Sequence, residues 1–230
     1  MSDTTNKEYV RVWDLPLRLF HWGFAMAVFG AIGSAKAGVM WAHERFGLLI
    51  LALLAFRLIW GFVGGHHARF INFLVWPRQL FLWLRAATRS SSSDVSVGHS
   101  PIAGYSVIGL LFVPLIMGLT GIISTDGILF DGPLAHLVPA WSANAAKAHH
   151  NISWALFILV GLHIAAIVFY KMIKKKGLTA AMVHGRAIGH ATAAGPDGHI
   201  SRAKTAFGLA LIASLVAGAQ MIVLLRPAYF

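Results

Sequence analysis

Long hydrophobic stretches recur along this chain, and charged residues bound each of them. Five stretches have the roughly 17 to 25 residues that a helix needs to cross a hydrocarbon core about 30 Å thick. They cover residues 19–35, 46–65, 102–125, 148–170 and 205–225. The pattern therefore predicts an all-α integral membrane protein with five spans.

The composition agrees with this pattern and excludes several kinds of chemistry. Hydrophobic residues make up 57% of the chain and charged residues only 12%, whereas soluble domains carry about 25% charged residues. The chain has no cysteine, which excludes thiolate-bound iron–sulfur clusters, disulfides, covalently attached c-type haem and thiolate zinc sites. Twelve histidines remain as metal ligands.

The basic residues predict how the protein lies in the membrane. The net charge is +11, and in a membrane protein such an excess reports orientation rather than nucleic-acid binding. Fourteen Lys and Arg residues fall on the side of the N-terminus and four on the other side, namely Lys36, Arg45, Lys147 and Arg226. Because basic loops stay in the cytoplasm, we expect a multi-pass protein of the bacterial inner membrane with a cytoplasmic N-terminus and a periplasmic C-terminus.

The chain divides into four expected parts. Residues 1–10 form an N-terminal cytoplasmic tail, 11–186 the main membrane domain, 187–203 a flexible cytoplasmic linker, and 204–230 the fifth transmembrane helix with the periplasmic C-terminus. The first span resembles a secretory signal because Ala35-Lys36-Ala37 resembles a cleavage site. Its aromatic residues are atypical of a removable segment, so we expect it to be retained.

Histidines at membrane depth are the main candidates for function, since an ionisable side chain inside a span is costly. They are His21, His43, one of the neighbours His149 and His150, and His163. A separation of 14 residues turns a helical side chain by a net angle of about 40°, and 13 residues by about 140°. His149 therefore shares a face with His163, about 21 Å away along the axis. Depth pairs His43 with His149 on the outer side and His21 with His163 on the inner side.

Two histidine pairs at two depths in a helical bundle are the arrangement that binds two b haems, each held by an axial imidazole from two helices. We expect a four-helix bundle that holds these haems, plus the fifth helix. With both axial positions occupied, the iron would carry electrons and would not bind a substrate. We expect His150 to point toward the outer headgroups or to form a hydrogen bond. Solvated or interfacial roles are expected for His66, His67, His99, His136, His184, His190 and His199.

Cationic side chains near these histidines are candidate partners for the haem propionates. Arg57 follows His43 by 14 residues and so should share its face at inner depth. The alternative is that Arg57 only snorkels to the cytoplasmic interface. Arg18, Arg45 and Lys147 are weaker candidates at the rims.

Several motifs resemble the prokaryotic cytochrome b561 family, which is similar to the cytochrome b subunits of nickel–iron hydrogenases. They are the segments 12–22 (VWDLPLRLFHW), 43–47 (HERFG), 56–64 (FRLIWGFVG), 98–101 (GHSP) and 149–166, which starts HHN and ends GLHIAA. The likeness covers about residues 11–186. It implies a four-helix di-haem b core that works with quinones or redox partners.

The fifth span distinguishes this chain from the shortest members of that family. It is rich in small residues, which permit close helix approach. These are Gly208, Ala210, Ala213, Ser214, Ala217 and Gly218. The sequence leaves open whether this helix packs on its own core or docks a partner subunit.

The leading function is a di-haem cytochrome that transfers electrons between a redox partner and the quinone pool. The partner would be a periplasmic cytochrome c or a hydrogenase-type protein. Alternatively the chain is a self-contained oxidoreductase that passes electrons from a small oxidant or reductant such as superoxide to quinone. A histidine-based proton-relay transporter is a more remote alternative, because no acidic residue falls within the predicted spans.

Overall fold

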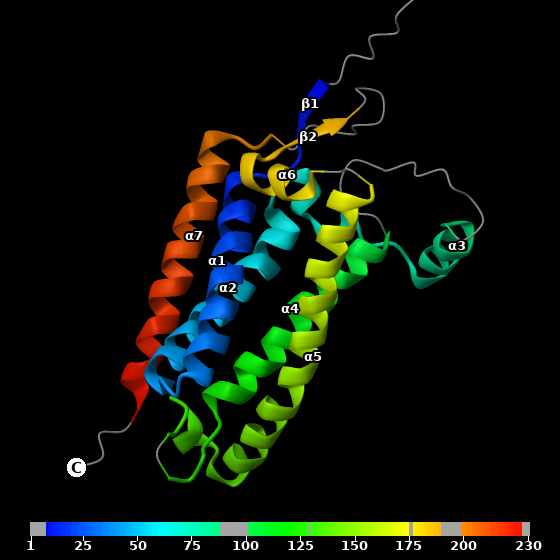
Figure 1. The fold of residues 1–230 in the computed structure, drawn as a ribbon. Helices are drawn as coiled ribbons and strands as arrows, with labels where there is room; N and C mark the ends of the chain where they lie inside the picture. Colours follow the sequence, from blue (N-terminus) through cyan, green and yellow to red (C-terminus); the bar gives the residue numbers. More distant parts are fainter. Residues whose placement is uncertain (1–7, 88–100, 129, 175–176, 190–198, 227–230) are drawn as a thin grey trace, which may run out of the picture.

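The protein is a bundle of long helices (Figure 1). The computed structural model describes residues 8–87, 101–128, 130–174, 177–189 and 199–226. Five of the described helices are long and apolar enough to cross a membrane. They are α1 (Leu15–Lys36), α2 (Met40–Val63), α4 (Pro101–Ile122), α5 (Pro139–Met172) and α7 (Arg202–Met221), which the 3-10 turn η4 (Ile222–Leu225) continues. The prediction of an all-α membrane protein with five spans is confirmed.

Shorter elements lie between the spans. They are η1 (His66–Ala68), η2 (Phe70–Asn72), α3 (Pro77–Ala87), η3 (Ala135–Leu137) and α6 (Leu178–His184). Strand β1 (Glu8–Arg11) pairs antiparallel with β2 (Arg186–Gly189), with Arg11 opposite Arg186. This two-stranded β1–β2 ribbon joins the end of the expected N-terminal tail to the start of the expected linker. Residues 190–198 of that linker lie outside the described residues, and its last two residues, Arg202 and Ala203, already belong to α7.

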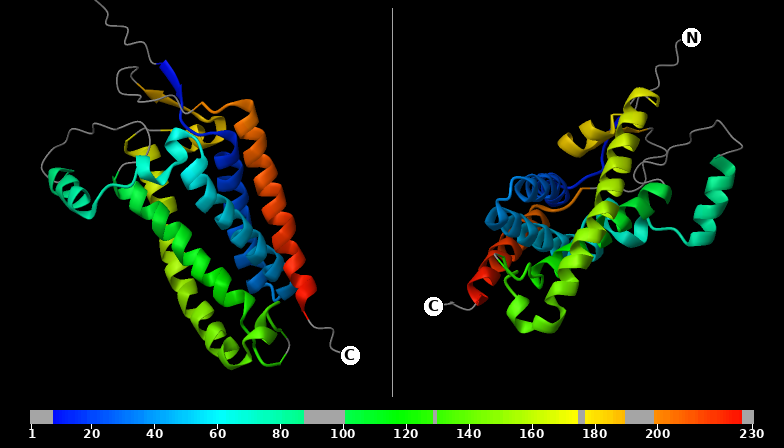
Figure 2. Two further views of the ribbon diagram at one scale, coloured as in Figure 1. Left: turned by 180° about the vertical axis from the view of Figure 1, so that it is seen from behind. Right: turned by 60° about the horizontal axis from the view of Figure 1, so that its bottom comes forward.

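Helix α2 is the centre of the bundle. Helices α1, α7 and α4 pack against it, and α5 packs against α4. Phe56 and Trp60 of α2 are fully buried in the resulting core. Among the described elements, the backbone of α5 packs closely on α4 and not on α1 or α2, and the views show α4 and α5 together, across the bundle from α7 (Figures 1 and 2). Helix α3 contacts α4 and otherwise stands apart from the spans.

All five spans begin before the stretches that their hydropathy predicts, and the difference is largest for α5 and α2. Helix α5 begins at Pro139 instead of residue 148, and α2 begins at Met40 instead of residue 46. The first turns of α5 contain Ser142, Asn144 and Lys147 among many alanines. Alanine favours helix, while the polar side chains lower the hydropathy. A hydropathy scan finds the part of a helix that lies in lipid, and it misses turns that extend beyond it.

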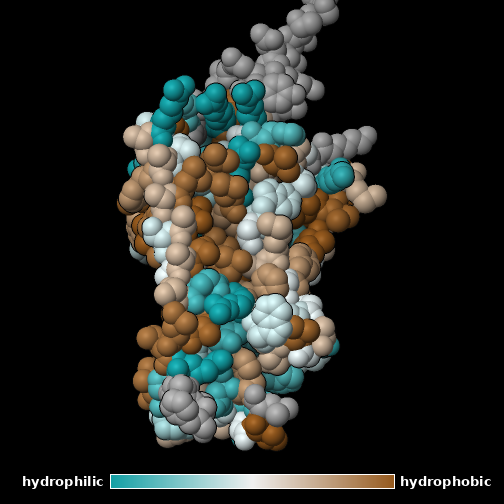
Figure 3. All heavy atoms as spheres, turned by 90° about the vertical axis from the view of Figure 1, so that its left-hand side faces the viewer, coloured by the Kyte–Doolittle hydropathy of each residue, from teal (hydrophilic) through white to brown (hydrophobic). Residues whose placement is uncertain are grey.

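Helix α7 packs on its own core, which answers one question that the sequence leaves open. Gly208 is buried, and a Cβ at this position would lie 2.7 Å from atoms of both Pro16 and Trp60. The Lys204 ammonium donates to the Gly64 carbonyl at 3.0 Å. The other small residues of α7 are exposed on the far side, namely Ala210, Ala213, Ser214, Ala217 and Gly218. The face that carries α7 shows a broad apolar band between hydrophilic side chains at its two ends (Figure 3).

Candidate functional site

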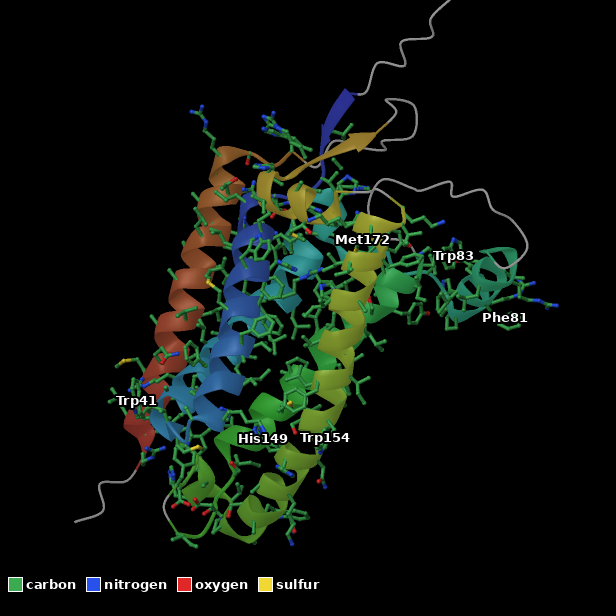
Figure 4. All side chains as sticks on the ribbon, in the orientation of Figure 1. Trp41, Phe81, Trp83, His149, Trp154 and Met172 are labelled. Carbon is green, nitrogen blue, oxygen red and sulfur yellow. The ribbon has the colours of Figure 1, made fainter. Side chains whose placement is uncertain are left out.

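His43 and His149 meet near one end of the bundle. Their rings lie edge to face, with centres 5.9 Å apart and planes at 90°. His43 comes from the first turn of α2 and His149 from the third turn of α5. His149 projects from α5 toward the side that α1 and α2 occupy (Figure 4). The neighbouring His150 is exposed, so the structure brings together the two residues that the helical spacing predicts.

Backbone carbonyl groups hold both rings in a defined orientation. Nδ1 of His43 lies 2.8 Å from the Ala31 carbonyl oxygen, and Nδ1 of His149 lies 2.8 Å from the Met117 carbonyl oxygen. A carbonyl oxygen only accepts hydrogen bonds, so Nδ1 of each ring carries the proton. The lone pair of each neutral imidazole then lies on Nε2. Such bonds are the usual means of orienting histidine ligands of a metal.

The distance between the two ring centres, though not their edge-to-face orientation, matches that of two imidazoles that share a metal ion. Metal–imidazole bonds are about 2 Å long, and each bonded nitrogen lies about 1 Å from its ring centre, so a bridged pair has centres roughly 6 Å apart. Gly47 lies one turn after His43, and a Cβ there would meet no atom within 4 Å. A Cβ at Gly121 of α4 would approach Cε1 of His149 at 3.1 Å. Gly47 therefore borders open space beside the two rings, whereas Gly121 packs closely against the His149 ring.

His21 and His163 form the second predicted pair, nearer the ribbon end of the bundle. They lie on α1 and α5 and are close enough to interact electrostatically. Both side chains are half-buried. Nδ1 of His21 is buried and has no hydrogen-bond partner among the residues that the structure describes. The two imidazoles thus lie near each other on helices whose backbones are not closely packed, and Nδ1 of His21 is left without a hydrogen bond in the described chain.

Arg57 is one of the few buried charged residues in the described chain. Its side chain is 3% exposed, and its guanidinium carbon lies 4.5 Å from the centre of the Phe70 ring. Atom Nη1 is buried without a hydrogen-bond partner in the described ranges, while Asp14 is near enough for an electrostatic attraction. The guanidinium is therefore covered by protein, near the start of α1 and the connection that follows α2. A buried, incompletely bonded guanidinium is what an anionic group of a cofactor would use.

The other predicted cations differ in their surroundings. Arg18 is half-buried, and its Nε lacks a hydrogen-bond partner within the described part of the chain. Arg45 is exposed and donates to the Gln220 backbone carbonyl at 3.0 Å. Lys147 is exposed on α5. Arg18 therefore stays the better of the rim candidates.

The remaining described histidines lie in short elements and connections, and His199 is exposed in the connection before α7. His66 and His67 pack edge to face in η1, His136 lies in η3, and His184 ends α6. His99 and His190 lie outside the described residues. Within the described ranges, no group of three or more His, Cys, Asp or Glu side chains could hold a metal ion.

Asp14 is a buried residue that the sequence analysis does not single out. Its carboxylate caps α1 by accepting from the Leu17 backbone N–H at 2.9 Å. It also accepts from Trp60 Nε1 at 3.1 Å and from the Gly65 backbone N–H at 3.2 Å. An Asp followed by a Pro at the second helical position is a helix-start signal, so the cap is visible in the sequence. The link to Trp60 is not.

Comparisons with known proteins identify the family to which this chain is similar. The prokaryotic cytochrome b561 family matches residues 12–185. A probable Ni/Fe-hydrogenase B-type cytochrome subunit of Bradyrhizobium diazoefficiens is 25% identical over 211 residues, covering 76% of this chain and 85% of the relative. Similarly named proteins of Azotobacter chroococcum and Escherichia coli are 26% and 25% identical. The first covers 76% of this chain and 87% of the relative, and the second 52% and 61%.

Proposed function

Because the chain belongs to the prokaryotic cytochrome b561 family, and is thus a membrane b-type cytochrome of electron transfer, we propose that it carries two haems. It transfers electrons across or within the bacterial inner membrane, between a redox partner and the quinone pool. The observation that carries this proposal is the meeting of His43 and His149 across α2 and α5, with both Nδ1 atoms bonded to carbonyl oxygens.

Each histidine pair would hold one haem. The Nε2 atoms of His43 and His149 would be the axial ligands at one site, and His21 with His163 would be the ligands at the other. When bound between two imidazoles, haem b supplies a one-electron carrier whose iron has no open position for a substrate. Arg57 would donate to a propionate of the second site, and Arg18 would do so at its rim. The protein thereby fixes the two sites in depth and excludes water from them.

The charge distribution supports an orientation with the ribbon in the cytoplasm. The described Lys and Arg residues gather at the ribbon end, where β1, β2 and α6 lie, while Lys36, Arg45, Lys147 and Arg226 are at the other end. The positive-inside rule then places the N-terminus in the cytoplasm and residue 226 on the periplasmic side. His43 and His149 would face the periplasm.

The names of the relatives favour a hydrogenase-type partner. Residues 123–138 connect α4 to α5 at the His43 end and hold only the short turn η3 besides irregular backbone. A large catalytic domain has no place there, so chemistry on a large substrate would belong to another protein. The quinone would exchange electrons with this chain from within the membrane.

Haem content measured by the pyridine haemochrome method, together with reduced-minus-oxidised spectra, tests the proposal. We expect about two b haems in the wild type. His43→Ala and His149→Ala should lose the same haem, and His21→Ala and His163→Ala the other. His150→Ala, a matched control one residue away, should lose neither. A folded wild-type protein without haem would overturn the proposal and favour the proton-relay transporter.

A second measurement tests the electron acceptor and donor. The dithionite-reduced protein should be reoxidised rapidly by a soluble quinone analogue under anaerobic conditions. Failure of quinone to reoxidise it would overturn the quinone assignment. If superoxide reduces the oxidised protein as fast as any protein partner does, the self-contained oxidoreductase is the better description.

A further inference from the structure

The end of α7 is bonded to the two residues that follow His43. Gln220 and Arg45 share three hydrogen bonds. Arg45 donates to the backbone carbonyl of Gln220 at 3.0 Å and to its side-chain oxygen at 3.3 Å, and the Gln220 amide donates to the Arg45 backbone carbonyl at 3.1 Å. Arg226 forms an ion pair with Glu44 at 2.9 Å. The last described residue of the chain thus reaches a residue adjacent to a proposed haem ligand.

The ion pair with Arg226 compensates the cost of burying the Glu44 carboxylate. Its side chain is only 7% exposed, against 33% for Arg226. A buried carboxylate without a cation is costly, and Arg226 supplies the cation. Arg226 also donates to the Asp131 carbonyl at 2.7 Å and lies 5.8 Å from the centre of the Phe130 ring. These contacts hold the guanidinium between α2 and the connection from α4 to α5.

We propose that Arg226 is a positioning residue for the His43 site: by neutralising Glu44 beside His43, it raises the reduction potential of the haem there. This inference rests on the proposed function. The oxidised state of a haem carries one more positive charge than the reduced state, so a nearby uncompensated carboxylate favours oxidation. The ion pair removes this effect, and the fifth helix thereby tunes a site whose ligands all lie on other helices.

The size of the effect follows from Coulomb's law. Adjacent helical residues have Cα atoms about 3.8 Å apart, which puts the Glu44 carboxylate on the order of 10 Å from the metal position. At an effective dielectric constant of about 20, one charge at that distance changes the ratio of oxidised to reduced protein on the order of tenfold. A tenfold change corresponds to about 59 mV for one electron.

A spectroscopic redox titration of the full-length haem-loaded protein tests this inference. It is done in the His163→Ala background, which leaves only the His43 site. We expect Arg226→Gln to lower the reduction potential, so that at a fixed applied potential the ratio of oxidised to reduced protein rises about tenfold. Combining Arg226→Gln with Glu44→Gln should restore the potential of the parent. Arg226→Lys keeps the charge and should titrate like the parent. Gln220→Ala is the matched control, because it cuts a contact between α7 and α2 without changing a charge.

The outcomes separate charge from mechanical support. Equal shifts for Arg226→Gln and Gln220→Ala, or no shift for Arg226→Gln, would overturn the inference while two haems in the wild type still supported the proposed function. A wild type without haem would overturn both. If Arg226→Gln alone fails to bind haem, Glu44→Gln is compared with the double variant. A higher reduction potential in Glu44→Gln, which keeps Arg226, than in the double variant would support the role of the Arg226 charge. Equal potentials in the two would reject it.

Discussion

Trp60 near the end of α2 donates its indole N–H to Asp14 at the start of α1, 46 residues earlier in the chain. Trp60 is fully buried, and Asp14 is 7% exposed. The same carboxylate caps α1 and accepts from Gly65 just beyond α2. One acidic side chain therefore fixes the relative height of two helices, and α1 carries His21 two turns after Asp14.

Replacing Asp14 by Ala should destabilise the protein strongly. The change removes a helix cap, worth about 1 kcal/mol, and leaves buried donors at Trp60 and Gly65 unbonded, for a total of about 2–4 kcal/mol. An SDS unfolding titration in mixed micelles measures this loss. Ser201 caps α7 through a single bond to the Lys204 backbone N–H and is exposed, so Ser201→Ala should cost at most about 1 kcal/mol. Equal losses in the two variants would contradict the role of Asp14.

Two glycines of α7 should respond in opposite ways to the same substitution. Gly208→Ala places a Cβ within 2.7 Å of Pro16 and Trp60, whereas a Cβ at Gly218 meets no atom within 4 Å. We expect Gly208→Ala to push α7 away from α2 and lower the unfolding free energy by about 1–3 kcal/mol. Gly218→Ala should be neutral or slightly stabilising, because Ala favours helix. Comparable thermal unfolding of the two variants would show that α7 does not pack through Gly208.

The open space beside His43 should be sensitive to filling. Gly47→Leu puts a branched side chain where a Cβ now meets no atom within 4 Å. If that space holds a cofactor, the haem content should fall by about one per chain while the helical circular dichroism is unchanged. Gly33→Leu is the control, because Gly33 also has open space but is exposed on α1. Unchanged haem content in Gly47→Leu would mean that the space is not used.

Arg57 should affect the haem-free and haem-loaded proteins differently. Without the cofactor, Arg57→Met replaces a buried, incompletely bonded charge by an apolar side chain, a change that is often neutral or stabilising. With the cofactor bound, it removes a charge-assisted hydrogen bond worth about 1.5–3 kcal/mol. Thermal unfolding of both forms measures the difference, with the exposed Arg78→Met of α3 as control. A loss of the same size in both forms would rule out the propionate contact.

Hydropathy predicts the five spans well because a bilayer demands apolar side chains over a fixed length. It predicts neither the β1–β2 ribbon nor α6, since short elements outside the lipid depend on distant partners. Helical arithmetic selects His149 over His150, and the structure places only His149 against His43. The residue spacing on one helix gives the direction of a side chain but not its neighbours on other helices. It therefore does not predict that the Ala31 and Met117 carbonyl groups contact the two histidines.

The long-range polar contacts of the site could not be predicted from the sequence. Glu44 and Arg226 are 182 residues apart, and nothing near either residue indicates its partner. The small residues of the fifth span predict close packing, which Gly208 makes with Pro16 and Trp60. The exposed small residues of α7 show the same local pattern without a neighbour. Composition alone cannot tell these two faces of α7 apart.

The position of α7 has a consequence for how the chain is assembled during synthesis. The last span lies against α1 and α2, the first two. At about 5–20 residues per second, the ribosome makes residues 173–226 in the few seconds after α5 is complete. During that interval His21, His43, His149 and His163 have already been made, but α7 is not yet packed against α2. Until Arg226 has been made and α7 has packed on α2, Glu44 lacks the cation with which it pairs in the folded protein.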